Sequence, residues 1–392
     1  MSRAQGYGCG LMRRLLLLVS VLVFADTMLY AALTPLLPHF AHTLHLAKSQ
    51  AGALVAAYAI GALIGALPGG LAAVRMAPRR TVLVGLALMG LASVGFALAG
   101  EFETLFAARL AQGAGSAFTW AGAFAWLLAA APRGRRGELI GAAMGAAVLG
   151  AMLGPVVGAF AALAGRAAVF CMLAGLALVL AAWTGRLQLP PDVATAQIAL
   201  PRALADPRFS GGLALMSLAS LLFGILSVLA PLRLAGAGWG AGAIGAIWLG
   251  GAAVEAIESP LLGRLSDTLG ALLPVRLALA SSLLVSLGLS TGARPLLYAP
   301  LVLAASASYG ALFTPAFALI ADGAERAGLA QGMAFGLMNA AWAVGAAVGP
   351  AAAGAIAAAT GDWIPFLLAA AACAAALPAA RGVARAAPAE AV

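Results

Sequence analysis

The feature that most constrains this chain is a series of long apolar stretches that recur along its whole length. Each holds about 20 or more mostly apolar residues, the length that an α-helix needs to cross the hydrocarbon core of a bilayer. Because backbone groups in lipid must be satisfied within the segment, each stretch predicts a transmembrane helix in an all-α membrane protein. The twelve predicted spans are roughly 14–37, 50–73, 81–100, 104–129, 138–163, 167–185, 210–234, 241–262, 275–293, 295–320, 329–358 and 362–380.

Composition excludes the soluble classes. Only 9% of the 392 residues are charged and 64% are hydrophobic, whereas about a quarter of a soluble domain is charged. The net charge of +9 does not indicate nucleic-acid binding, because the basic residues are scattered in twos and threes between the apolar runs. Three cysteines lie far apart, so neither a disulfide framework nor a metal site is predicted. No GxxxxGK[ST] or GxSxG pattern occurs, so neither ATP hydrolysis nor another enzyme activity is expected, and no cofactor is expected.

The arginines predict the orientation of the spans. Seventeen of the 22 Lys and Arg residues fall on the side that holds both termini, and four (Lys48, Arg166, Arg233 and Arg294) fall on the other. Cytoplasmic loops carry the excess of basic residues, so both termini are predicted to be cytoplasmic. Arg13 and Arg14 precede the first apolar run as in a signal peptide, but its length, Asp26 and Pro35 favour a retained helix.

The chain divides into two six-span halves. The weakly apolar stretch around residues 186–209 separates an N-terminal bundle, 1–185, from a C-terminal bundle, 210–392. A glycine–proline series in the fifth span recurs 195 residues later in the eleventh, which predicts an internal repeat. The series is Gly141, Gly150, Gly154 and Pro155, followed by Gly158, and its counterpart is Gly336, Gly345, Gly349 and Pro350.

Several of these segments resemble signatures of one family. The segment Gly263-Arg264-Leu265-Ser266-Asp267-Thr268-Leu269-Gly270, predicted as a cytoplasmic loop, resembles the loop signature of the major facilitator superfamily. Its first-half counterpart keeps Gly70, Arg75, Pro78, Arg79 and Arg80, while Val74 and Ala77 stand where that signature has aspartate and glycine. Leu105-x3-Arg109-x2-Gln112-Gly113-x-Gly115 resembles the fourth-helix motif of the superfamily.

Two further segments resemble particular groups of transporters within this superfamily. The fifth-span series resembles the motif of drug:proton antiporters, with Ala159 in place of its final glycine. Asp26-x3-Tyr30-x4-Pro35-x2-Pro38 resembles the first helix of twelve-span drug-efflux and vesicular amine transporters. The resemblance implies two pseudo-symmetric six-helix bundles around a central cavity. It also implies that the fifth and eleventh spans close one side of that cavity, and ordinary small-residue packing is the alternative.

The loop segments carry a separate prediction. The resemblance implies that Gly70, Arg79, Arg80, Gly263, Arg264, Asp267 and Gly270 form a latch at the seam between the halves. The alternative is a solvated turn. The loss of aspartate at Val74 implies a weaker latch in the first half.

Four ionisable residues lie inside predicted spans, where each is costly and needs a partner or water. They are Asp26, Arg109, Glu255 and Glu258. Glu255 and Glu258 share a helix face, and two neighbouring carboxylates resist simultaneous ionisation, as a proton site requires. The alternatives are a packing pair with a hydroxyl for Asp26, bonds to backbone carbonyls for Arg109 and solvation at the cytoplasmic end for Glu258. The resemblance implies proton relay for Arg109.

Other candidates are the large or polar side chains that the spans would present to a cavity. The set is Tyr30, Trp120, Phe223, Trp248, Phe313, Asn339 and Trp342. Arg109 and Trp120 fall on one helix face at 100° per residue. An aromatic residue at such a spacing also suits plain packing, whereas a mid-membrane amide such as Asn339 is costly facing lipid.

The sequence and the resemblance together predict a proton antiporter that exports small hydrophobic or amphiphilic compounds by alternating access. Its predicted partners are a small-molecule substrate, protons and the lipid of the cell membrane, with no nucleic acid and no obligate protein partner, so that it works as a monomer. Two alternatives stay open. One is efflux or uptake of sugars or metabolites, which would need a more polar cavity. The other is a non-transporting receptor or scaffold, which would not need Asp26, Arg109 and Glu255 together.

Overall fold

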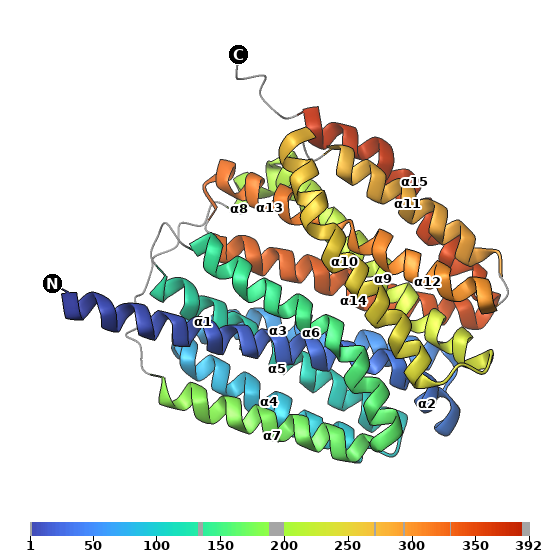
Figure 1. Cartoon of the computed structure of the whole chain (residues 1–392), viewed down its shortest axis with the longest axis horizontal. Coiled ribbons are helices and arrows are strands. Elements are labelled where there is room, and N and C mark those ends of the chain that lie inside the picture. Colours follow the sequence, from blue (N-terminus) through green and yellow to red (C-terminus); the bar gives the residue numbers. More distant parts are fainter. Residues whose placement is uncertain are drawn as a thin grey trace. The chain divides into compact units, whose positions relative to one another are not determined.

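The structure, a computed structural model, is built of α-helices throughout the residues that it describes, which are 2–131, 136–187, 200–269, 272–292, 295–329 and 331–385. No strand occurs among them. The helices are α1 (Ser2–Ala31), α2 (Leu33–Thr43), α3 (Lys48–Arg75), α4 (Pro78–Leu98), α5 (Phe102–Ala130), α6 (Arg136–Ala164), α7 (Arg166–Arg186), α8 (Leu200–Ala205), α9 (Pro207–Gly236), α10 (Ala241–Leu269), α11 (Leu272–Ser290), α12 (Pro295–Gly310), α13 (Phe313–Ala327), α14 (Gln331–Thr360) and α15 (Trp363–Arg385) (Figure 1).

The membrane-spanning character of the helices follows the apolar pattern. Eleven helical segments in the described part of the chain are long and apolar enough to cross a membrane, and they coincide with eleven predicted spans. The twelfth predicted span is α5, which is as long as its neighbours but carries the buried polar side chains of Arg109, Gln112, Ser116 and Thr119. These side chains lower its hydropathy, so α5 spans as part of a bundle that shields its polar face.

Two of the predicted spans contain a short break that the sequence did not predict, although each still forms one candidate membrane span. The first breaks at Ala32, between α1 and α2, and the tenth breaks at Ala311 and Leu312, between α12 and α13. A proline lies three or four residues after each break, at Pro35 and Pro315. A proline ring clashes with the carbonyl four residues earlier and suits the first turn of a helix, which is where Pro35 and Pro315 lie after each break.

The segment 263–269 was predicted to lie in a loop, and this prediction is wrong. The helix α10 continues through Leu269, because no proline occurs in this polar segment to stop it. Part of the predicted linker is helical as well, since α8 and the first turn of α9 lie within it. Asp206 caps α9 by accepting hydrogen bonds from the backbone N–H groups of Arg208 and Phe209.

The described chain forms two compact units. The first comprises residues 1–36 and 57–195, and the second comprises residues 37–56 and 196–392. The helix α3 therefore belongs to the second unit up to Ala56 and to the first unit from Ala57 on. The division of the chain into bundles at 185 and 210 remains a prediction.

Within each unit, long helices lie side by side (Figure 1). In the first unit α1 packs along α6, and α4 packs against both α5 and α7. In the second unit α9 packs along α14, and α11 packs along α15. The helices α6 and α14 carry the repeated glycine–proline series, and α1 and α9 hold the first span of each half, so the two units repeat one packing arrangement.

Candidate functional site

The candidate site is a buried polar network in the first unit, centred on Asp26 of α1. Its side chain is 2% exposed. Tyr58 of α3 donates its hydroxyl to Oδ1 at 2.8 Å. Ser116 and Trp120 of α5 donate to Oδ2 from Oγ at 2.9 Å and from Nε1 at 2.6 Å. Three donors from two neighbouring helices thus converge on one carboxyl group.

Arg109 of α5 forms the second centre of the network and is 1% exposed. Its guanidinium donates to the backbone carbonyls of Leu29 at 3.3 Å and Tyr30 at 3.1 Å, and to Oε1 of Gln112 at 3.0 Å. Its Cζ also lies 4.8 Å from the centre of the Tyr58 ring, within the range of a cation–π interaction. Tyr58 therefore contacts both charged groups.

The carbonyls that Arg109 uses lie near the end of α1. The last carbonyls of a helix have no partner within the helix, and the break at Ala32 leaves them available to another side chain. Arg109 thus occupies a position that the proline-induced break creates. One nitrogen, Nε, has no hydrogen-bond partner within the described residues.

The polar face of α5 follows from its sequence. Arg109, Gln112, Ser116 and Trp120 recur at spacings of three and four, which places them along one side of a helix. Gln112 extends the network by donating from Nε2 to Oγ of Ser93 in α4 at 3.3 Å. The same face also explains why Arg109 and Trp120, predicted to point the same way, both reach α1.

The arrangement has two chemical consequences. Three donors around Asp26 suit an ionised carboxylate, and protonation would add an O–H to the carboxyl group that needs an acceptor of its own. A proton at Asp26 is therefore tied to the positions of Tyr58 and Ser116. The same contacts also match the alternative predicted for these residues, because Asp26 binds hydroxyl groups and Arg109 binds backbone carbonyls.

Sequence reasoning did not select three residues of this network. Tyr58, Ser116 and Ser93 were not among the predicted site residues. Ser116 could have been found, because it lies one turn from Gln112 and one turn from Trp120 on the same face of α5. Tyr58 carried no such signal, since it stands alone among small and apolar residues in α3.

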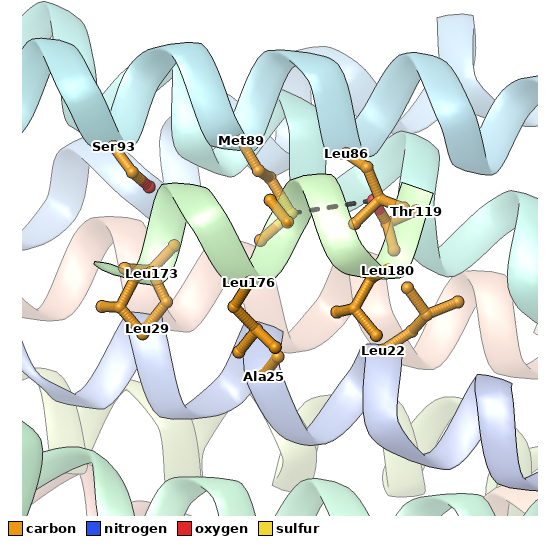
Figure 2. A pocket seen from close by; sticks show the side chains of 11 residues that line it. Leu22, Ala25, Leu29, Leu86, Met89, Ser93, Thr119, Leu173, Leu176 and Leu180 are labelled. Carbon is orange, nitrogen blue, oxygen red and sulfur yellow. Dashed lines mark hydrogen bonds between the residues drawn. The ribbon is translucent and has the colours of Figure 1, made fainter. Parts of the chain in front are cut away.

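A small cavity lies beside this network, between α1, α4, α5 and α7 (Figure 2). Its volume is about 30 Å³, room for little more than a water molecule. Figure 2 shows leucine side chains from three helices around it, with Ser93 and Thr119 as its polar members. Because sites for organic ligands enclose roughly 300–1,000 Å³, this cavity is a packing defect and not a substrate site.

The other two intramembrane carboxylates lie in the second unit, on α10. A side chain added at Gly310 would meet Cδ of Glu255 at 2.6 Å, so Glu255 packs against the end of α12, next to the break before α13. Glu258 is half-buried, and its Oε1 is buried with no hydrogen-bond partner in the described part of the chain. The predicted proton-coupling residues thus fall into two groups, one in each unit.

The aromatic candidates of the second unit form a partial cluster. The rings of Phe223 and Phe313 stack with centroids 5.8 Å apart, and Tyr309, which was not predicted, meets Phe223 edge-on at 6.0 Å. Trp248, Asn339 and Trp342 are half-buried on α10 and α14. In the first unit, the ring of Tyr30 lies 5.1 Å from that of Tyr58.

The predicted glycine series makes close helix contacts within each unit. A side chain at Gly154 of α6 would lie 2.5 Å from Cβ of Ala31 in α1, and one at Gly158 would lie 2.7 Å from Cγ of Pro35. In α14, a side chain at Gly349 would lie 2.9 Å from Cα of Leu221 in α9. Gly150 and Gly345 make similar contacts, whereas Gly141 faces open space. Pro155 and Pro350 lie inside unbroken helices.

Hydroxyl groups bridge the same two helix pairs. Thr27 Oγ1 of α1 donates to the carbonyl of Ala147 in α6 at 2.7 Å, and Ser217 Oγ of α9 donates to the carbonyl of Ala341 in α14 at 2.8 Å. The repeat is thus visible in polar contacts as well as in glycine positions.

The residues of the predicted latch are only partly described. Arg79 donates to the carbonyl of Gly185 at the end of α7, while Arg80 is exposed. A side chain at Gly70 would meet open space. The side chains of Arg264 and Asp267, the surroundings of Gly263 and the whole of Gly270 lie outside the described residues.

These features define a polytopic helical membrane protein with ionisable side chains buried in a repeated bundle, which is the construction of a secondary transporter. The profile of the Major Facilitator Superfamily matches residues 17–335. The chain therefore belongs to the Major Facilitator Superfamily. The predicted fold class and superfamily are confirmed.

Solved structures share this fold. A bacterial homologue of the human lysosomal transporter Spinster, in an inward-facing and unoccupied conformation, matches with a TM-score of 0.74 and 14% sequence identity over 96% of this chain and 98% of that chain. The nucleoside transporter NupG matches with a TM-score of 0.73 and 15% identity over 95% and 99% of the two chains. At these identities the similarity concerns the fold alone. No curated protein matches the chain significantly in sequence.

Proposed function

We propose that this protein is a proton-coupled exporter of small hydrophobic or amphiphilic compounds that works by alternating access. The observation that carries the proposal is the burial of Asp26 and Arg109 in one polar network of the first unit. Ionisable groups inside membrane spans are costly and are characteristic of ion or proton pathways.

Asp26 is the group proposed to couple the two fluxes. A carboxyl group that takes up a proton or binds a substrate can exclude one by binding the other, which links the two equilibria. Its protonation would add an O–H donor among the hydroxyl groups of Tyr58 in α3 and Ser116 in α5, so the proton is proposed to affect the hydrogen bonds to these helices. Glu255 and Glu258 are the proposed second proton site, since they are neighbouring acidic groups on α10.

The proposed substrate class rests on the aromatic and apolar character of the candidate cavity residues. Tyr30, Phe223, Phe313 and Trp342 offer apolar and aromatic surface, and Asn339 and Gln112 supply few hydrogen bonds for a sugar. Nucleosides belong in any test, because a nucleoside transporter shares the fold. The proposal includes a location in the cell membrane with cytoplasmic termini, activity as a monomer and no catalytic activity.

The test is transport in proteoliposomes with an imposed pH gradient, in both orientations, across cationic amphiphiles, sugars and nucleosides. We expect a gradient to drive accumulation of an amphiphilic compound in the wild-type protein. In Asp26→Asn, gradient-driven transport should be lost while equilibrium exchange of substrate survives, because the substitution preserves shape but removes the titratable group.

The matched control is Asp322→Asn. Asp322 is an aspartate that pairs with Arg208 and is half-exposed on α13, and a surface ion pair contributes little. This variant should transport as the wild type does. Gradient-driven transport at the wild-type rate in Asp26→Asn would remove Asp26 from the coupling, and transport of sugars or nucleosides alone would replace the proposed substrate class.

A further inference from the structure

The start of α3, which belongs to the second unit, contacts α14 and the turn that follows α14. Lys48 Nζ lies 2.5 Å from Oδ1 of Asp362, at the turn between α14 and α15. One turn further on, a side chain at Gly52 would lie 3.0 Å from Cα of Gly354 in α14, so the two backbones touch. The ion pair is partly exposed and contributes little by itself, but together with the glycine contact it fixes the position of this end of α3.

A few turns later, the same helix packs closely against α5. A side chain at Gly113 of α5 would lie 2.7 Å from the carbonyl carbon of Tyr58 and 2.8 Å from the backbone nitrogen of Ala62. Gly61 makes a similar contact with Leu110. No proline interrupts α3 between Lys48 and Tyr58, a rise of about 15 Å along the helix axis. The helix is therefore continuous between these two sets of contacts.

Tyr58 lies where α3 passes from its contacts with α14 to its contacts with α5. The helix α3 passes from the second unit to the first between Ala56 and Ala57, and Tyr58 is the next residue. Its side chain is 1% exposed. Its hydroxyl donates to Asp26 and its ring lies beneath the guanidinium of Arg109. Among the described donors to Asp26, Tyr58 alone comes from α3.

We propose that Tyr58 is a positioning residue that couples the Asp26–Arg109 network to the contact between the start of α3 and α14. When the hydroxyl of Tyr58 holds Asp26, α3 is held in the position in which Lys48 meets Asp362. When that hydrogen bond is lost, the start of α3 leaves α14 more readily. The inference rests on the proposed function in taking Asp26 as the coupling group, but its test requires no substrate.

The experiment measures the closeness of α3 and α14 by cross-linking. Lys48 and Asp362 are replaced by cysteine in a chain whose own cysteines, Cys9, Cys171 and Cys373, are replaced by alanine. A short bifunctional thiol reagent then reports how often the two positions meet. Tyr58→Phe should lower the rate of cross-linking at least about threefold, because a buried hydrogen bond to a charged group is worth more than that factor.

Ser116→Ala is the matched control. It also removes one hydroxyl donor from Asp26, but from α5, so the cross-linking rate should stay close to that of the parent chain. Both variants lose a single oxygen atom, and monodisperse elution in detergent verifies their folding. An equal rate in all three proteins, or an equal fall in both variants, would overturn the proposal.

A second measurement reads the coupling in the opposite direction, which thermodynamic reciprocity requires. The infrared carboxyl band of Asp26 is identified by its loss in Asp26→Asn. It should shift in Asp362→Asn, which breaks the ion pair with Lys48, and stay in place in Asp322→Asn, which breaks the pair with Arg208. An unmoved band in Asp362→Asn would contradict the coupling. If instead Asp26→Asn keeps gradient-driven transport, the proposed function fails while cross-linking still decides the role of Tyr58.

Discussion

The buried charged side chains of this protein lie where backbone carbonyls or hydroxyl groups can form hydrogen bonds with them. Arg109 binds carbonyls that the break after α1 leaves unpaired in the helix, and Asp26 is surrounded by three donors. Charged side chains are tolerated inside a membrane because their hydrogen bonds within the protein replace hydrogen bonds lost with water. Each charged side chain therefore depends on its hydrogen-bond and ring partners, and Tyr58 is a partner of both Asp26 and Arg109.

Ala77 provides a prediction at this scale. It precedes α4 with φ 72° and ψ 145°, a conformation that suits glycine, and the superfamily signature has glycine at this position. Such a backbone costs of order 1–3 kcal/mol in other residues. We expect Ala77→Gly to raise stability by about 1 kcal/mol, after allowing for the greater freedom of glycine in the unfolded chain. Thermal unfolding in detergent measures the change.

Ala99 is the control for this prediction, since it follows the same helix with an ordinary extended backbone, φ −60° and ψ 127°. Ala99→Gly should lower stability, because glycine relieves no strain there and adds only unfolded-state entropy. A fall in the melting temperature of both variants would show that Ala77 is not strained.

Helices in this protein are shaped by prolines and joined by glycines. Pro35 and Pro315 follow breaks, whereas Pro155 and Pro350 lie inside continuous helices. Glycines beside the two inner prolines bring α6 close to α1 and α14 close to α9. A proline inside a membrane helix is tolerated where neighbouring helices pack against it.

The glycine contacts predict a matched pair of defects. Gly154→Leu and Gly349→Leu should each abolish transport while the protein still inserts, because a leucine forces the paired helices apart at a cost of roughly 1–3 kcal/mol. The two variants should resemble each other in severity, since the contacts repeat. Transport and the yield of folded, detergent-extracted protein are measured together.

Gly141→Leu and Gly336→Leu are the controls, one in each half. A side chain at either position meets no atom of the described residues within 4 Å, so both variants should transport normally. Normal transport by Gly154→Leu and Gly349→Leu as well would show that these helix contacts play no part in the transport cycle.

The whole molecule combines a repeated helical unit with a strong asymmetry of charge. Family membership and the shared fold place it among transporters built from two such bundles. The sequence predicts an excess of arginine on the side that holds the termini, and basic loops resist translocation across the membrane.

The orientation gives a prediction for the whole chain. Cysteines introduced at Gly6 and Ala386, in a chain without its own cysteines, should resist an impermeant thiol reagent in intact cells and react after permeabilisation. A cysteine at Gly238, in the turn between α9 and α10, should react from outside. External labelling at Gly6 or Ala386 would contradict the twelve-span topology.

The sequence by itself determined which segments cross the membrane, the repeat and the superfamily. Each span must satisfy its own backbone in lipid, so length and apolar content are local properties that can be read without the fold. It also marked Asp26 and Arg109, because an ionisable residue stands out in an apolar run. The polar face of α5 was likewise visible in its spacing, although Ser116 was overlooked.

Only the tertiary structure decided which groups meet. Tyr58 has no sequence signal, and its role arises because close contacts along α3 bring it to Asp26 and Arg109. The breaks at Ala32 and Ala311 were likewise visible only in the structure, because other prolines of the chain lie inside continuous helices. Contacts between helices depend on how side chains far apart in sequence fill shared space, and no periodicity within one helix records that.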